Sequence, residues 1–177
     1  MQAFTLGRDN SDSAWTFVTA AFSHVELTHL LGSLVPFWIF SNMLLAAGIG
    51  PFDYWFLVMG SAIWGNFAFL LHNRKYESIV RRILGTCTRG TGLSGVIMGL
   101  AVVISLSAPT ARISVGVFRI PVYLVVILCL AVAPTSLEHP QLGPGQVMRL
   151  GGAMYGALFC LLRPRNVALP FAEQLET

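Results

Sequence analysis

Ser94 is the residue whose surroundings are best suited to nucleophilic chemistry. It stands in the segment Gly92-Leu93-Ser94-Gly95, at the start of a long apolar run. The glycines on either side allow a substrate or a second backbone to approach the hydroxyl closely, and the unpaired N–H groups of a helix start can stabilise an oxyanion. Small residues and serines are also common wherever membrane helices touch, so the segment taken alone favours plain helix packing.

His29 and Ser33 form a second polar pair. They are four residues apart, which places both on one face near the start of a predicted helix, where both side chains can donate hydrogen bonds into a polar pocket. An alternative is that His29 and the nearby His24 are interfacial histidines bonded to loop carbonyls. Apart from Glu26 no third strong ligand stands near them, and the three cysteines show no CxxC spacing, so we expect neither a metal site nor a cofactor.

Arg149 is the most informative single charge in the chain. It precedes the thirteen uncharged residues 150–162, which make only about 20 Å of helix. A helix that crosses roughly 30 Å of hydrocarbon must therefore include Arg149. Because an arginine within a span is costly in lipid, we expect this side chain to face a cavity, a partner or the membrane interface.

Two pairs of glycines predict a close contact between helices. Gly95 and Gly99 form one pair with GxxxG spacing, and Gly152 and Gly156 form the other. This spacing lets two membrane helices pack backbone against backbone. We therefore expect the two helices that carry these glycines to touch along them.

All these residues lie on or beside apolar runs that predict an all-α, polytopic transmembrane helix bundle. Of the 177 residues, 55% are hydrophobic and 11% are charged, against about 25% charged in soluble domains. Runs of about 20 uncharged residues are long enough to cross a bilayer. We expect a single domain over residues 1–177 with about five spans, at about 27–49, 54–71, 91–108, 114–133 and 145–162.

The polar segments indicate the surroundings of the protein. The net charge of +3 comes from scattered Lys and Arg residues, without the basic stripe typical of nucleic-acid binding, so we expect the lipid bilayer and no nucleic acid as a partner. Residues 72–90 are interpreted as the main loop, with a short interfacial helix. The charge count places this loop, the N-terminus and residues 134–146 on the cytoplasmic side. The first fourteen residues lack the features of a signal peptide, and the sequence does not identify the membrane.

In their order along the chain, these segments resemble the rhomboid family of intramembrane serine proteases, over residues 15 to about 163. Gly92 to Gly95 resembles the GxSG nucleophile motif of that family, and Arg149 with Gly152 and Gly156 resembles its last helix. The start of the family's second helix is similar in spacing to a set of residues before the first long apolar run: Trp15, Thr19, Phe22, His24 and His29.

The resemblance implies a role for each matched residue. Ser94 would be the nucleophile at the floor of a water-filled cavity, and His29 would lie in the oxyanion pocket with Ser33, which stands where the family usually has asparagine. Arg149 stands where the family has its catalytic histidine. Arginine keeps its proton at any physiological pH, so it cannot accept one from a serine hydroxyl.

The sequence departs from the family pattern at other positions besides Ser33 and Arg149. Met98 stands where the family usually has an aromatic residue, and Thr16 replaces an arginine that often follows the tryptophan. The sequence before Trp15 also shows no apolar run that resembles the first helix of the family. The family arrangement would also place residues 72–90 on the extracytoplasmic side, against the charge count.

Three functions compete on these observations. The favoured hypothesis is a rhomboid-like pseudoprotease that binds transmembrane segments of client proteins. The alternative is an active rhomboid-type serine endopeptidase that uses Ser94 with a substitute base, for which His139 is the candidate in the loop before the last span. The third is a channel or transporter subunit with Arg119 and Arg149 along an anion path, against which the ordered rhomboid motifs argue.

Overall fold

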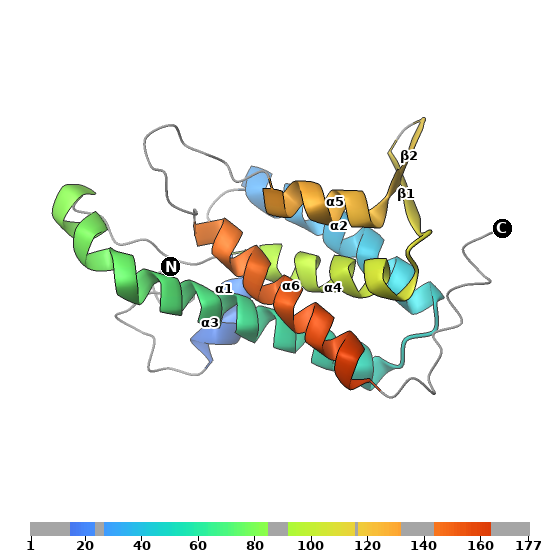
Figure 1. The fold of residues 1–177 in the computed structure, drawn as a ribbon, viewed down its shortest axis with the longest axis horizontal. Coiled ribbons are helices and arrows are strands. Elements are labelled where there is room, and N and C mark those ends of the chain that lie inside the picture. The colour runs from blue at the N-terminus through green and yellow to red at the C-terminus, as the bar shows by residue number, and fades with distance from the viewer. Residues whose placement is uncertain (1–14, 24–26, 85–91, 116, 132–143, 164–177) are drawn as a thin grey trace.

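The computed structural model describes residues 15–23, 27–84, 92–115, 117–131 and 144–163, and the side chains of 73–84 and of Val115 are not described. Over these residues the chain is a bundle of helices with one β-hairpin, which confirms the predicted helical bundle (Figure 1). The elements are α1 (Thr16–Phe22), α2 (Leu27–Ala46), α3 (Pro51–Leu84), α4 (Ser94–Ser107), β1 (Arg112–Val115), β2 (Phe118–Pro121), α5 (Val122–Ala131) and α6 (Pro144–Leu162).

Helix α4 lies in the middle of the bundle. It contacts α6 most extensively and also packs against α3, α2 and α5 (Figure 1). Its sequence is apolar on every side, as expected for a helix surrounded by others. Of its fourteen residues, those from Gly95 to Ile104 are buried except Ile97. The first residue of this central helix is Ser94.

A short turn joins α2 to α3; the two helices hardly touch each other, and each packs against α4. Gly48 has a φ of 79°, a left-handed conformation that glycine adopts without strain, and it turns the chain after α2. Pro51 opens α3 at a position where its missing N–H costs no hydrogen bond, and Asp53 in the first turn suits the helix dipole. Within the described residues, two helical segments are long and apolar enough to cross a membrane, Leu27–Ala46 and Pro51–His72.

Helix α3 continues well beyond its apolar part. The prediction of a loop from residue 72 was wrong as far as Leu84, because α3 runs without a break for 34 residues, about 51 Å. Its last part contains Arg, Lys and Glu, and long unbranched side chains of this kind favour a helix when no proline or glycine interrupts them. The charges that suggested a loop therefore mark the point where the residues of α3 change from apolar to polar, and the helix continues past it.

The predicted span at 114–133 was wrong over residues 114–121. These residues belong to an antiparallel hairpin in which Ile113 pairs with Ile120 and Ser114 with Arg119. Polar and β-branched residues alternate in Arg112–Val115, which favours a strand over a helix. Helix α5 begins only at Val122 and is ten residues long, about 15 Å.

The short helix α1 was not predicted. The buried side chain of Asn66 on α3 donates a hydrogen bond from Nδ2 to the Phe17 carbonyl at 2.6 Å. The Gly92 amide donates to the Ala20 carbonyl at 3.0 Å. These two bonds tie α1 to α3 and to the segment that leads into α4.

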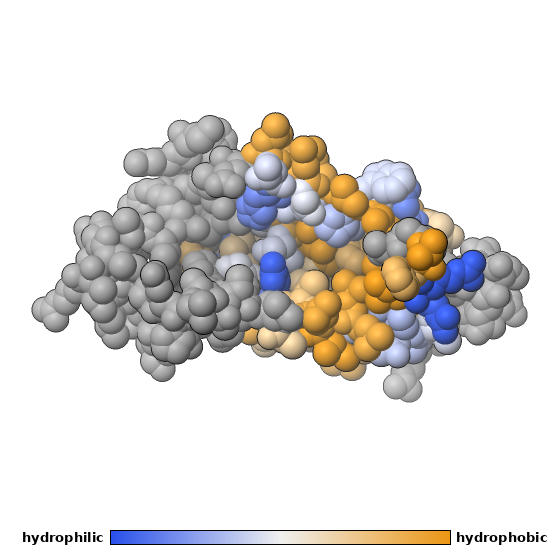
Figure 2. Space-filling model, turned by 90° about the horizontal axis from the view of Figure 1, so that it is seen from above, coloured by the Kyte–Doolittle hydropathy of each residue, from blue (hydrophilic) through white to orange (hydrophobic). Residues whose placement is uncertain are grey.

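Much of the outer surface is apolar. Figure 2 shows apolar side chains across the middle of one face of the molecule, with strongly polar residues toward one end. A soluble monomer rarely exposes large contiguous apolar patches, whereas lipid-facing helices do. The exposed apolar side chains include Leu31, Val35 and Trp38 on α2, Phe52, Trp55 and Phe56 on α3, and Leu124, Ile127 and Leu128 on α5.

Candidate active-site cavity

Ser94 is positioned by a sharp turn of the backbone just before α4. Gly92 has a φ of 105°, a value that residues with a side chain rarely adopt, and this conformation turns the chain into the helix. Leu93 follows as the N-cap and is buried, and Ser94 is the first helical residue. The serine hydroxyl therefore lies beside the unpaired N–H groups of a helix start.

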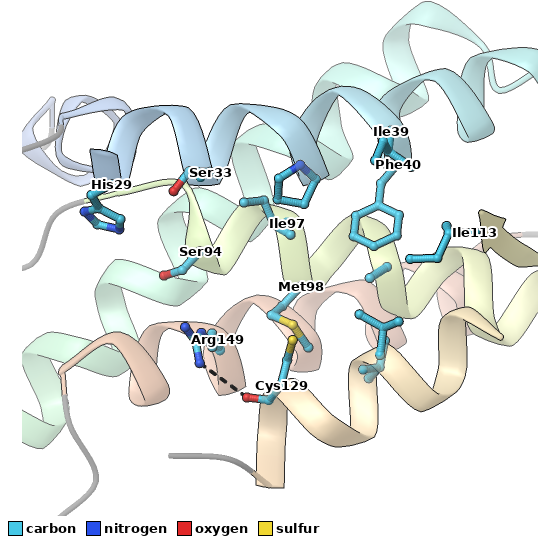
Figure 3. A pocket seen from close by; sticks show the side chains of 15 residues that line it. His29, Ser33, Ile39, Phe40, Ser94, Ile97, Met98, Ile113, Cys129 and Arg149 are labelled. Carbon is cyan, nitrogen blue, oxygen red and sulfur yellow. Dashed lines mark hydrogen bonds between the residues drawn. The ribbon is translucent and has the colours of Figure 1, made fainter. Parts of the chain in front are cut away.

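A cavity of about 330 Å³ lies between α2, α4, α5 and α6. Figure 3 shows its polar side chains gathered at one end, where Ser94 lies between His29 and Ser33 on one side and Arg149 on the other. The rest of the cavity is apolar. Its lining there includes Pro36, Ile39, Phe40, Ile97, Met98, Ala101, Ile113, Val125 and Val126.

The four candidate site residues differ in exposure. Ser33 is buried, Ser94 and Arg149 are partly buried, and His29 is exposed. The described part of the chain contains no hydrogen bond to the Ser94 hydroxyl. The cavity thus brings together the residues predicted for nucleophile, oxyanion pocket and base position. His24 and His139 lie outside the described residues.

Arg149 is held by neutral acceptors. Its Nη1 donates to the Cys129 carbonyl and to Gln146 Oε1, both at 3.4 Å. Gln146 is almost fully buried and donates from Nε2 to the Leu130 carbonyl. The end of α5 and the first turns of α6 are therefore joined through these two side chains. Over the described ranges, Arg149 forms no ion pair, and the salt bridge present is Arg163 to Asp53, at 2.8 Å.

The four glycines of the predicted contact face one another across α4 and α6. A Cβ atom at Gly152 would overlap the carbonyl group of Gly95, and one at Gly156 would lie 2.5 Å from the carbonyl oxygen of Gly99. No side chain fits at such contacts. The two backbones are thus in direct contact. This contact fixes the position of Ser94, the residue before Gly95, relative to α6, which carries Arg149.

Sequence analysis missed several residues that build this arrangement. Gly65 on α3 lies against the Met148 carbonyl, and Gly151 lies against the Trp64 carbonyl, so α3 and α6 also pack backbone to backbone. A detectable signal was the spacing of Ser61 and Gly65, two small residues four apart. Gln146 gave no such signal, because a lone glutamine beside a glycine-rich joint has no characteristic pattern.

Metal binding and anion conduction find little support in the part of the chain that the structure describes. No group of three His, Cys, Asp or Glu residues comes together there. Arg119 is exposed on β2 opposite Ser114 and does not line the cavity that contains Arg149. The two arginines of the third hypothesis therefore do not share a path through this cavity.

Comparisons with known proteins agree with this arrangement. The family model of the Rhomboid domain matches residues 11–166. Rhomboid protein 1, mitochondrial, from Saccharomyces cerevisiae is 31% identical over 116 residues, which cover 66% of this chain and 32% of the yeast protein. The chain thus spans about a third of the length of this relative. No solved structure matches the chain.

Proposed function

Because this chain belongs to the rhomboid family and is an integral membrane protein, we propose that it is a pseudoprotease that binds transmembrane segments of client proteins. The scaffold of the family is kept, including Ser94 at the start of the central helix. The chemistry proposed to be lost is the removal of the proton from the serine hydroxyl.

The observation that carries this proposal is the place of Arg149. It lies on α6 and lines the same cavity as Ser94, and the resemblance to the family assigns it the position of the catalytic histidine. Its guanidinium is a donor only and stays protonated at physiological pH. Loss of the base from a serine triad lowers the rate by several orders of magnitude.

Client binding is supported by the helices that flank the cavity. Both α2 and α5 contribute lining residues, and both expose apolar side chains on the outside, among them Leu31 and Val35 on α2 and Leu124 and Leu128 on α5. A transmembrane helix of a client could pack against these surfaces through van der Waals contacts in the lipid. Without hydrolysis, such a complex would persist and affect trafficking or turnover of the client.

The chemical half of the proposal is tested with a fluorophosphonate probe on the purified, detergent-solubilised protein. We expect no labelling of the wild type, and labelling of Arg149→His that is lost in the double variant Ser94→Ala, Arg149→His. Since a positioned general base contributes about 10²- to 10⁴-fold, Arg149→His should label at least about 10²-fold faster than the double variant, which gives the background rate. Labelling of the wild type that disappears in Ser94→Ala would overturn the proposal.

The binding half is tested with a photo-crosslinking amino acid at Leu124, compared with the same amino acid at Phe118 on the exposed hairpin. We expect mass spectrometry to find crosslinks from position 124 to membrane-spanning peptides of other proteins, in excess over position 118. Equal yields at the two positions would contradict client binding at α5.

The second candidate is an active endopeptidase, and the retention of Ser94 in a polar cavity favours it. Under this hypothesis the wild type reacts with the probe, and both Ser94→Ala and His139→Ala abolish the reaction. If labelling is lost in Ser94→Ala but persists in His139→Ala, the protein is an active enzyme whose base is a residue other than His139.

A further inference from the structure

The charge of Arg149 lacks a counter-ion in the described residues. Asp53 is the acidic side chain that the structure describes, and it pairs with Arg163 near the opposite end of α6. The contacts of Arg149 are two neutral oxygens at 3.4 Å, which is long for a charge-assisted hydrogen bond. A partly buried cation whose described contacts are neutral oxygens is costly, and an anion that fills the adjoining space would offset that cost.

The adjoining cavity is suited to an anion with a single apolar chain. Its polar end holds Arg149, Ser94, Ser33 and His29, so an oxygen-bearing head group would meet one guanidinium, two hydroxyls and an imidazole (Figure 3). Its other end is walled by apolar side chains of Phe40, Ile113 and other residues. The volume of about 330 Å³ is at the lower end of the range for small-molecule sites, so one acyl chain fits and a two-chain lipid does not.

We propose that this cavity binds a free fatty acid, with its carboxylate on Arg149 and its chain along the apolar wall toward Ile113. A carboxylate matches a guanidinium in geometry, since two parallel N–H···O bonds form, and it matches the single charge of Arg149. A phosphate monoester carries up to two negative charges at neutral pH, of which the guanidinium of Arg149 would compensate one. Neither a metal nor a covalent step is involved.

The proposal does not depend on the pseudoprotease function. An active or an inactive Ser94 leaves the shape of the cavity and the charge of Arg149 unchanged. Outcomes of the probe experiment and of the fatty-acid experiment can therefore be told apart, because the first reports reactivity at Ser94 and the second reports occupancy of the cavity.

The experiment uses the full chain in lipid nanodiscs and a photoactivatable dodecanoic acid. We expect crosslinks to peptides of α2, α4 and α5 that line the cavity, and competition by unlabelled dodecanoic acid at least about tenfold stronger than by dodecanol or lysophosphatidic acid. Stronger competition by lysophosphatidic acid would contradict a carboxylate ligand. Equal competition by the alcohol and the acid would contradict any role of charge.

Variants provide a second test. Arg149→Gln should weaken the competition by dodecanoic acid about tenfold to a hundredfold, while the competition by dodecanol stays unchanged. Arg149→Lys should keep part of the competition by dodecanoic acid, because it keeps the positive charge. Arg119→Gln is the matched control, since it removes an exposed arginine outside the cavity, and should change nothing. Val126→Trp should block the apolar end and weaken acid and alcohol alike. Unchanged acid binding in a folded Arg149→Gln variant would overturn the proposal.

Discussion

Gly152 on α6 lies directly against the backbone carbonyl of Gly95 on α4, so that even a methyl group at position 152 would overlap it. Both partners at this contact are backbone atoms. Neither can rotate away as a flexible side chain does, so any added atom must push the helices apart.

The first prediction follows from this contact. Gly152→Ala should lower the free energy of unfolding by about 2 kcal/mol or more, the cost typical of inserting atoms into a closely packed interior. Gly145→Ala is the matched control on the same helix, since a Cβ there meets nothing within 4 Å. It should be neutral or slightly stabilising. Thermal unfolding in one detergent measures both, and equal melting temperatures would contradict the backbone contact.

The second prediction concerns Asn66, which anchors α1 to α3. Asn66→Ala should destabilise the protein by about 1 kcal/mol, because it removes the hydrogen bond that joins α3 to the Phe17 carbonyl of α1. Asn42→Ala is the control. Asn42 is exposed and bonds within its own helix to the Trp38 carbonyl at 2.8 Å, so its loss should cost less than about 0.5 kcal/mol. Chemical denaturation of both variants checks the difference.

The third prediction concerns the ion pair of Asp53 and Arg163, which joins the start of α3 to the end of α6. The side chain of Asp53 is 44% exposed and that of Arg163 is 12% exposed, so solvent screens the charge of Asp53 more than that of Arg163. Asp53→Asn should destabilise by about 1 kcal/mol. A double-mutant cycle with Arg163→Gln isolates the coupling of the two charges. If the two single effects simply add, the pair does not stabilise the fold.

The fourth prediction is a pH dependence in Arg149→His. A histidine acts as a base only when it is neutral, so fluorophosphonate labelling should rise with pH and level off above its pKa, ordinarily about 6.5. The wild type should stay unlabelled over the same range, because arginine does not deprotonate. Labelling rates measured between about pH 5 and pH 9 test this. A flat profile in a labelled variant would mean that the introduced imidazole is not the base.

Helices and cavity residues could be predicted from the sequence where one sequence pattern alone determines the structure. Uncharged length predicted the span at 27–49, which corresponds to α2 at Leu27–Ala46. Resemblance to the rhomboid family, confirmed by the match to the Rhomboid domain, placed Ser94 and Arg149 on facing elements. Their occurrence in one cavity depends on packing that involves α2, α4, α5 and α6 together.

Other features could not be derived because two rules conflict. Residues 114–121 are nearly uncharged, which suggests a span, yet polar and β-branched side chains alternate in Arg112–Val115, which suggests a strand, and the hairpin forms. Charges at 72–84 suggest a loop, while their helix propensity extends α3. The carbonyls of Cys129 and Leu130 that accept bonds from Arg149 and Gln146 are backbone groups, and a sequence carries no signal for them.

The glycine contacts between α4 and α6 have a consequence for how such a protein can change over time. Folding energy resides in the backbone packing of residues 95, 99, 152 and 156, whereas reactivity would reside in the side chain at 149. On the proposed function, natural selection could therefore act on the two traits separately, because one substitution at position 149 would change turnover while the helix packing is inherited unchanged.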